Sequence, residues 1–498
     1  MVALPWLAGA LVVSPVAYYS VMAVYNIYFH PLSKYPGPKS WSATPFHYAI
    51  LQLRGTCPKD TAKMHQKYGP VLRISANELS FTYPGAWRDI FGHKGSGQPE
   101  FKKDERFHAA TNKEQNIISS DREYHTYLRK LLANGFSDSA LRQQEGLIQG
   151  YLDTLMSRLN EKGNAGGSAV DLALWFNYFT FDVIGYLTYG ESFDCLNFSA
   201  LNAWVSSFFA FVIYTANCQA AARLPSFVRR PLVSLVTPRD RKQQFALSEG
   251  ILDQKVKARL QNKPPVPDFM EKLIDAYRKK AMSFYQLKTN SQLLIGAGSE
   301  TTATALSGIV YLLAMHPEQY AKVTTEIRTQ FASAEEITMV SVNKCRYLFA
   351  VIEEGLRMYP PSSTAHSRYV PPGGATLDGN FVPEGMLVGI TTYAIMHAKE
   401  NWVNPDKFAP ERWLPEGERP EEYNADKKDS FQAFSYGPRN CIGRNLAYAE
   451  MKIVLARLLW EFDVEYCGPK GDDWLDQPIY VVWQKKPLMV KLHPRNKA

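Results

Sequence analysis

Most of the chain places its hydrophobic residues at helical spacing. From Leu446 to Trp460, apolar positions recur at three- and four-residue steps, as on one face of an amphipathic helix. A longer stretch of helical character runs from about Ser283 to His316. We therefore expect a body that is mainly α-helical.

Signals for strands are few and lie in three places. Residues Tyr68–Phe81 predict an early pair of strands, and Met386–Thr392 predicts a strand after a Gly/Pro break. The segments Tyr480–Trp483 and Leu488–Leu492 predict a hairpin near the C-terminus. A small β subdomain beside the helical body is therefore expected.

The N-terminal segment is apolar. Residues 1–29 carry no charged side chain, and Leu4–Phe29 is long enough to span a bilayer, which requires about 20 residues. A cleavable signal peptide would have a basic first region and a small-residue cleavage site, and neither is clear here. We therefore expect a transmembrane anchor at 1–29.

Charge places the remainder of the chain relative to the membrane. Positive residues begin only after the span, at Lys34, Lys39 and Arg54, so the positive-inside rule predicts a cytosolic body. Residues 30–40 form a proline-rich hinge, and no linker divides residues 41–498, which are expected to be one catalytic domain. The sequon at Asn197 is then expected to stay unmodified.

Composition excludes several classes of protein. The six cysteines are few and scattered, without a Cys-x-x-Cys pair, which argues against zinc and favours a reducing compartment. The net charge is +8, but no Lys/Arg run is interleaved with aromatic residues, so nucleic acid is not an expected partner. The basic surplus suits an acidic protein or an anionic membrane surface.

Cys441 is the strongest candidate for chemistry. It follows a Gly/Pro-containing turn and precedes the helix that starts near Leu446, where a helix dipole and the neighbouring Arg439 and Arg444 are expected to lower the pKa of its thiol. A structural cysteine, a reactive nucleophile and a thiolate ligand of haem iron all remain possible from this position alone.

The surrounding spacing favours the third interpretation. The order Phe434, Gly437, Arg439, Cys441, Gly443 closely resembles the cysteine loop of the cytochrome P-450 haem-thiolate monooxygenases. The resemblance implies that Cys441 is the axial ligand of haem b, that Phe434 shields its sulfur, and that Arg439 binds a haem propionate. It also implies the fold of that family, mainly α with a small β subdomain.

A second motif lies in the middle of the long helical stretch. Gly296 and Gly298 are costly inside a helix and indicate the close approach of a flat, bulky group; a dinucleotide loop is rejected because the third glycine and the preceding strand are missing. Glu300 and Thr301 resemble the family's oxygen-binding groove, where the alcohol holds a water and the acid relays protons. The alternative for Thr301 is a hydrogen bond to the carbonyl one turn earlier.

A third motif is structural. Glu354 and Arg357, three residues apart, resemble with Arg412 the family's buried Glu-Arg-Arg triad, which holds the loop that presents the cysteine. The same spacing at Glu416 and Arg419 falls in a polar loop and is expected to be solvated.

Further positions are assigned to the cofactor by resemblance. Arg368 and Arg129 are expected to hold the propionates, and Gly443 and Ala297 to lie against the haem. His125 stands where the family commonly has Trp; it either donates to a carboxylate or is exposed to solvent.

The resemblance also suggests the substrate and the partners. Outside the segment Gly95–Phe107, the pocket is expected to be lined by mostly apolar or small residues, which suits a lipophilic molecule such as a fungal terpenoid, polyketide or alkaloid. NADPH-cytochrome P-450 reductase, with cytochrome b5 as a second donor, is expected on a face that includes Lys130, Arg444 and Lys452, at the endoplasmic-reticulum membrane. The expected pocket segments are Gly95–Phe107, Phe208–Tyr214, Leu294–Ala297, Ser363–His366 and Pro478–Ile479.

Three functional classes compete. An oxygen-activating monooxygenase needs the thiolate, the Glu300–Thr301 pair and a reductase. A haem-thiolate isomerase or dehydratase needs no oxygen activation, and such relatives often lack the alcohol. A membrane-anchored haem sensor needs no proton relay. Thr301 therefore favours the monooxygenase.

Overall fold

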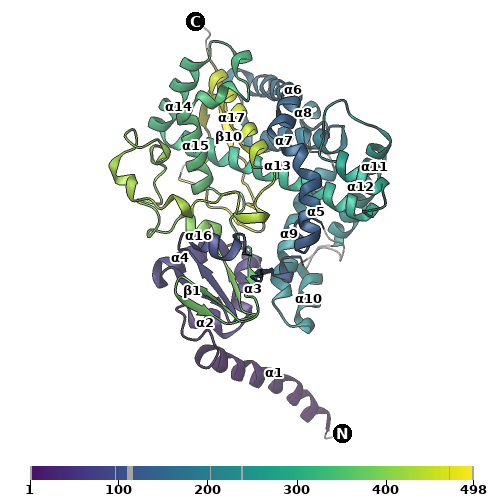
Figure 1. Cartoon of the computed structure of the whole chain (residues 1–498), viewed down its shortest axis with the longest axis vertical. Helices are drawn as coiled ribbons and strands as arrows, with labels where there is room; N and C mark the ends of the chain where they lie inside the picture. Colours follow the sequence, from purple (N-terminus) through teal and green to yellow (C-terminus); the bar gives the residue numbers. More distant parts are fainter. Residues whose placement is uncertain are drawn as a thin grey trace.

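The computed structural model describes residues 3–95, 97–108, 116–201, 203–236, 239–469 and 471–495. A large helical part lies above a smaller part that holds the main sheet, and helix α1 runs away from the sheet end (Figure 1). The helices are α1 (Ala3–Tyr28), α2 (Lys39–Ala43), α3 (Phe46–Arg54), α4 (Cys57–Tyr68), α5 (Arg122–Ala133), α6 (Asp138–Gly163), α7 (Leu172–Tyr189), α8 (Cys195–Phe198), α9 (Ala203–Ala222), α10 (Ser226–Val236), α11 (Arg239–Gln261), α12 (Glu271–Arg278), α13 (Phe284–Met315), α14 (Pro317–Gln330), α15 (Arg346–Met358), α16 (Thr392–Met396) and α17 (Arg444–Glu461). The strands are β1 (Val71–Ser75), β2 (Glu78–Phe81), β3 (Lys102–Lys103), β4 (Ala169–Asp171), β5 (Arg368–Tyr369), β6 (Ala375–Leu377), β7 (Asn380–Val382), β8 (Leu387–Gly389), β9 (Phe462–Tyr466) and β10 (Met489–Pro494).

Helix α13 is the centre of the helical part. It begins at a capping box, in which the Ser283 hydroxyl accepts from the Gln286 amide at 3.0 Å and the Gln286 side chain binds the Ser283 amide. Its side chains are buried over most of its length against α7, α15 and α17. This helix confirms the stretch expected from Ser283 to His316.

The interior glycine Gly298 serves helix packing. A Cβ on Gly298 would lie 2.6 Å from Cδ1 of Ile184 on α7. The expectation that a flat group approaches this glycine is therefore wrong, because a neighbouring helix occupies the position.

The main sheet has the strand order β1-β2-β8-β5-β3. Strands β1 and β2 pair antiparallel, with Val71 opposite Phe81, and β8 joins β2 in parallel. Both the early strand pair and the strand expected within Met386–Thr392 are confirmed. Leu79, Phe81 and Val388 are buried on this sheet in one apolar cluster.

The expected C-terminal hairpin is wrong. Strand β10 pairs instead with β9, which directly follows α17, and with β4. Residues 479–483 form a tight loop closed by one bridge between Ile479 and Trp483. The reason is Trp483, which is buried, stacks on Tyr359 at 4.1 Å between ring centroids and donates to the Pro360 carbonyl at 2.8 Å.

Helix α1 covers nearly all of the segment expected to span a membrane, and its end is fixed to the body. The Asn26 amide donates to the Ala43 carbonyl at 2.9 Å, and Arg73 of β1 donates to the Asn26 carbonyl at 2.8 Å. Leu32 and Tyr35, in the proline-rich segment, are buried against the main sheet. Among the described residues, the helix whose length and composition would suit a membrane span is α13, and its burial identifies it as a core helix.

Candidate cofactor site

The loop that carries Cys441 is set by glycine and by one backbone hydrogen bond. Gly437 has φ +76°, and a Cβ there would collide with the Phe91 carbonyl, so only glycine fits. The Cys441 amide donates to the Phe434 carbonyl at 2.9 Å. Helix α17 begins at Arg444, directly after Gly443, so the loop is held at the N-terminal end of that helix.

The Cys441 side chain is exposed to solvent, although protein atoms surround it closely. Burial raises the pKa of its thiol, while the Gly443 amide, Arg129 and Arg444 act in the opposite direction. The expected lowering of this pKa is therefore wrong for the protein alone, because desolvation of a thiolate outweighs the nearby dipole and cations. An open sulfur with an amide donor and two arginines nearby fits a thiolate that a metal ion stabilises.

Aromatic rings lie beside the cysteine loop. Phe434 packs against Tyr448 of α17 at 4.9 Å between centroids, and Tyr448 packs against Phe349 at 5.8 Å. The Tyr448 hydroxyl donates to Glu353, whose pKa burial raises to about 7. Phe349 is 39% exposed, so this row of rings extends from the cysteine loop to the surface.

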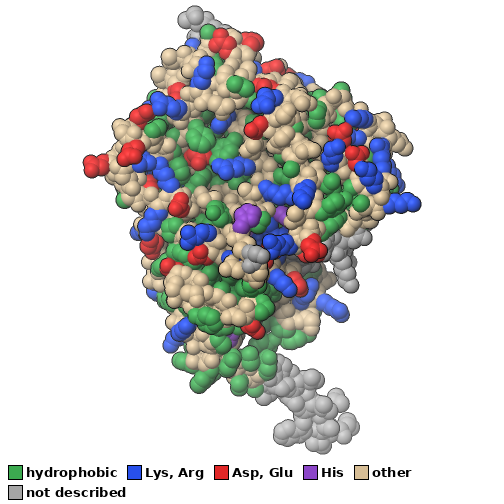
Figure 2. Space-filling model, in the orientation of Figure 1, with side chains coloured by type: hydrophobic (Ala, Val, Ile, Leu, Met, Phe, Trp, Pro, Cys, Tyr) green, Lys and Arg blue, Asp and Glu red, His purple; other side chains and the backbone are tan. Residues whose placement is uncertain are grey.

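Cationic side chains also lie near the cysteine loop. Arg129 of α5 donates to both the carbonyl and the side-chain oxygen of Asn440 at 2.5 Å. Arg439 donates to the Ser120 carbonyl at 3.0 Å and forms an ion pair with Glu100 at 3.3 Å. Figure 2 shows Lys and Arg side chains crowded near the middle of this face, between the helical part and the sheet part.

The charges of this cluster repel one another. Burial, with Arg439, Lys103, Arg129 and Arg368, lowers the pKa of His125 to about 4. Burial, Arg439 and Arg368 lower the pKa of Lys103 to about 6, and burial with Arg439 lowers the pKa of Arg368 to about 10. Glu100 opposes the latter two shifts. A buried group of cations with this little compensation fits the two propionates of a haem.

His125 is buried, at 6% exposure, so its solvent-exposed alternative is wrong. Lys103 also belongs to this cation cluster, which the sequence did not predict, although the segment Gly95–Phe107 was selected for the substrate pocket. Its pairing through β3 with Arg368 on β5 brings it to the cluster, and that pairing depends on tertiary structure.

The acid–alcohol pair of α13 separates into two environments. The Thr301 hydroxyl donates to the Ala297 carbonyl at 2.7 Å, which is the expected alternative, and its side chain stays accessible. Glu300 is buried and forms an ion pair with Lys485, and the Thr304 hydroxyl donates to it at 3.2 Å. Its other oxygen has no hydrogen-bond partner among the described residues. Lys485, in the C-terminal loop, gave no signal in the sequence.

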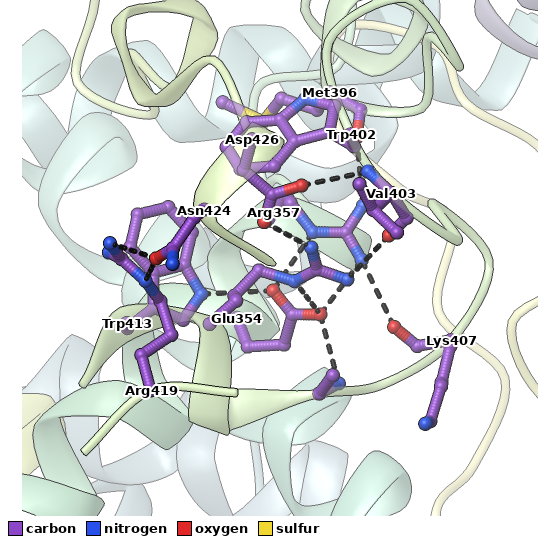
Figure 3. A network of polar contacts seen from close by, with 12 residues as sticks. Glu354, Arg357, Met396, Trp402, Val403, Lys407, Trp413, Arg419, Asn424 and Asp426 are labelled. Carbon is purple, nitrogen blue, oxygen red and sulfur yellow. Dashed lines mark hydrogen bonds and ion pairs between the residues drawn. The ribbon is translucent and has the colours of Figure 1, made fainter. Parts of the chain in front are cut away.

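The structure brings Glu354, Arg357 and Arg412 together in one buried network (Figure 3). The Glu354 carboxylate accepts from Arg357 at 2.9 Å twice and from Arg412 at 3.1 Å. Trp413 and the Ala409 amide supply two more hydrogen bonds, at 2.9 and 3.0 Å. Burial alone would raise the pKa of Glu354, but the two arginines hold it below its ordinary value.

A second acid completes this network. Asp426 accepts from Arg412 at 2.5 Å and from the Val403 amide at 2.7 Å, and it was missed because it lies far along the polar loop. Arg357 also donates to the Met396 carbonyl at 2.9 Å. The similar pair Glu416 and Arg419 lies apart: Glu416 is exposed and Arg419 binds Asn424 (Figure 3).

Some residues of the expected pocket segments lie outside the part of the chain that the structure describes. Ser96 lies outside the described residues, as do the side chains of Phe107 and Phe208. A narrow cavity of about 50 Å³ is lined by residues of three expected segments and by Arg223. The residues from those segments include Asp104, Arg106, Ala365 and Ile479. Apart from Arg223, this charged lining comes from the first expected segment, Gly95–Phe107, which the sequence did not predict to be apolar.

Comparison with known proteins identifies the same family that the cysteine loop resembles. The profile of the family described as Cytochrome P-450 matches residues 38–492. The chain is 40% identical over 493 residues to the cytochrome P-450 monooxygenase hepD of Aspergillus oryzae, covering 98% of this chain and 96% of that protein. It is 40% identical over 482 residues to the trichothecene C-15 hydroxylase of Fusarium sporotrichioides, covering 96% of each. It is 39% identical over 480 residues to the monooxygenase cpaH of Aspergillus oryzae, covering 96% and 92%.

Proposed function

Because the chain belongs to the cytochrome P-450 family of monooxygenases, we propose that it inserts one oxygen atom from O2 into a lipophilic small molecule, by hydroxylation or epoxidation. The observation that carries this proposal is the open sulfur of Cys441 beside a buried, undercompensated cluster of cations. Haem b, when bound, supplies the oxygen-activating chemistry of this family.

The residues around the haem then have distinct roles. Cys441 would supply the thiolate that holds the haem iron, and Phe434 holds the loop through its carbonyl and packs beside it. Arg368, Arg439, Lys103 and His125 receive the propionates, while Arg129 reaches the same region through Asn440. Gly443 and Ala297 complete the surroundings, because a small residue at each leaves room for a planar ring.

Thr301 and Glu300 move protons in this proposal. The Thr301 hydroxyl donates a hydrogen bond to the Ala297 carbonyl, so the lone pairs of the hydroxyl oxygen remain available to hold a water in the groove. Glu300 lies one residue away with a buried, unpartnered oxygen. To relay a proton through that water, its carboxylate would have to leave Lys485, take up a proton and then pass it on.

Electrons are proposed to come from NADPH through a reductase. Arg444 and Lys452 both lie over the Tyr448 ring, at 5.7 and 5.9 Å, next to the exposed Phe349. Two cations beside an exposed aromatic ring suit an acidic protein partner. The ionic-strength dependence of reductase-supported haem reduction tests this docking face, which would be insensitive to salt if the proposal were wrong.

We propose that α1 anchors the protein in the endoplasmic-reticulum membrane, with residues 41–498 as the cytosolic catalytic domain. Exposed apolar side chains lie on the described part of α1, and α10, which exposes Phe227 and Leu235, lies toward the same end of the molecule (Figure 1, Figure 2). Alkaline carbonate extraction of microsomes tests the anchor, and release of the protein into the supernatant contradicts it.

The substrate class is proposed from the relatives. One of them is named as a hydroxylase of a trichothecene, and others carry the names of fungal monooxygenases. A terpenoid, polyketide or alkaloid is the proposed substrate. Comparing the metabolites of the host with and without the gene tests this, with the missing product identified by mass.

The thiolate assignment is tested by Cys441→Ser. The wild-type holoenzyme, reduced and exposed to carbon monoxide, should give the long-wavelength band of thiolate ligation, and the variant should lose that band and all turnover. Cys467→Ser, at the other accessible cysteine, is the matched control and should change neither. A normal band in Cys441→Ser would remove the assignment.

The proton path is tested by Thr301→Ala. The variant should keep haem and thiolate but release hydrogen peroxide in place of product, because the groove loses the hydroxyl that holds its water. Thr301→Ser, which keeps the hydroxyl, is the control. Unchanged coupling of NADPH consumption to product in Thr301→Ala contradicts the relay and leaves the isomerase or dehydratase class open.

A further inference from the structure

A second charged cluster lies away from the cofactor site and centres on Glu78 of β2. This carboxylate is fully buried and accepts from two arginines: from Arg223 at 2.5 Å and from Arg106 at 3.4 Å. The Ser367 hydroxyl donates to it at 2.6 Å. Burial would raise the pKa of Glu78, but the two arginines bring it down to about 2, so the acid stays charged.

The cluster joins five segments that are distant in the sequence, counting β2 itself. Arg223 directly follows α9, donates to Gln52 of α3 at 2.9 Å, and lies 3.9 Å above the Tyr48 ring. Arg106 belongs to the short turn after β3 and is held by Asp104 at 2.8 Å. The Asp104 amide in turn donates to the Ser367 carbonyl at 3.1 Å, just before β5.

These ion pairs border the narrow cavity described above. Its lining extends from Tyr48 and Gln52 of α3 to Ala365 and Ile479, which belong to segments expected to face the substrate. A volume of about 50 Å³ holds a few waters at most, since one water needs roughly 10–15 Å³ measured in this way. A lipophilic molecule of modest size therefore does not fit in this cavity while the ion pairs are closed.

The two arginines differ in how much free energy is needed to separate each from Glu78. Separating Arg223 from Glu78 leaves a buried charge unpaired, because their side chains are 6% and 0% exposed. Arg106 is 20% exposed and pairs with Glu78 at the longer distance, so its release costs less. An open state would thus be a minor population, and Arg223 would control how often it occurs.

We propose that Glu78, Arg106 and Arg223 form an ion-pair latch across the substrate entrance. Bulky ligands enter only when this latch is open, so Arg223 determines which ligands are admitted. Small ligands pass without this step. The inference rests on the proposed monooxygenase site, since the latch has a purpose only if a substrate pocket lies beyond it.

The test uses the ferric holoenzyme and two nitrogen ligands of haem, imidazole as the small probe and clotrimazole as the bulky one. Stopped-flow absorbance at the Soret band measures the association rate of each. For Arg223→Gln we expect clotrimazole to associate about tenfold faster, which corresponds to about 1.4 kcal/mol, with the rate for imidazole unchanged. Arg223→Lys keeps the charge and should stay closer to the wild type.

Two further variants keep the test decisive. Arg106→Gln changes a partly exposed residue, and should give a smaller acceleration for clotrimazole even if Arg223→Gln fails to fold. Arg346→Gln removes an exposed ion pair with Glu418 and should change neither rate. Equal clotrimazole rates in Arg106→Gln and wild type, or equal acceleration for both probes, overturns the latch. Loss of the thiolate spectrum in the wild type overturns the proposed function instead.

Discussion

The triad around Glu354 and the cation cluster around Arg368 differ in how their buried charges are compensated. In the triad, each guanidinium meets a carboxylate, and Glu354 has a pKa below its ordinary value. In the cluster, burial and the nearby Arg439 lower the pKa values of Lys103 and Arg368, and Glu100 opposes both shifts. A charge network completed within the protein serves structure, whereas an incomplete one indicates a ligand of opposite charge.

The largest expected effect is on the completed network. Glu354→Gln leaves the buried Arg357 without a carboxylate and Arg412 with Asp426 alone, which should destabilise the protein by about 3–5 kcal/mol. Urea unfolding of the holoenzyme measures this, with Glu416→Gln in the exposed loop as the matched control that should change stability by less than about 0.5 kcal/mol. Equal stability of the two variants would remove the distinction between buried triad and solvated copy.

In the incomplete network, a substitution should affect haem binding more than the stability of the fold. Arg368→Met removes one of the mutually repelling cations, so unfolding stability should fall little, whereas haem should leave the protein about tenfold faster because a propionate loses its partner. Transfer of haem to excess apomyoglobin, followed at the Soret band, measures the rate. If Arg368→Met destabilised the protein as strongly as Glu354→Gln while holding haem normally, the cluster would be structural.

The smallest expected effect is on pH dependence before haem is added. Because the folded pKa of His125 is about 4 and an unfolded histidine titrates near 6.5, the unfolded chain binds more protons between those values. The stability that comes from neutral His125 is present above about pH 6.5 and is lost as the pH falls toward about 4. His125→Gln should therefore reduce the loss of apoprotein stability between pH 7 and pH 5, by about 1 kcal/mol.

Other buried histidines, His65 and His397, also have lowered pKa values, to about 4 and about 3, so the wild type should weaken in acid for several reasons. Urea midpoints at both pH values, compared with those of His65→Gln, separate the contribution of the cluster. With haem bound, the propionates should offset the neighbouring cations, and the effect of His125→Gln should shrink. An identical effect in apoprotein and holoenzyme would argue against propionates at this cluster.

The sequence revealed short-range patterns well. The capped helix after Ser283, the strand pair before Phe81 and the cysteine loop all depend on residues within a few positions of one another. It failed where partners come from distant segments. The C-terminal strand β10 pairs with β9 and not with the preceding segment of chain. Gly298 packs against α7, and Glu300 forms an ion pair with Lys485.

By itself, the sequence determined the family and the mainly helical body, and it singled out Cys441 as the proposed haem ligand, because the residues of the cysteine loop lie in one short window. Only the tertiary structure decided which charges are satisfied. Asp426 completes the triad, Lys103 enters the cation cluster, and Arg223 reaches Glu78 across 145 positions of chain. The reason is physical: the energy of a buried charge depends on distance and desolvation in space, and neither quantity can be read from separation along the chain.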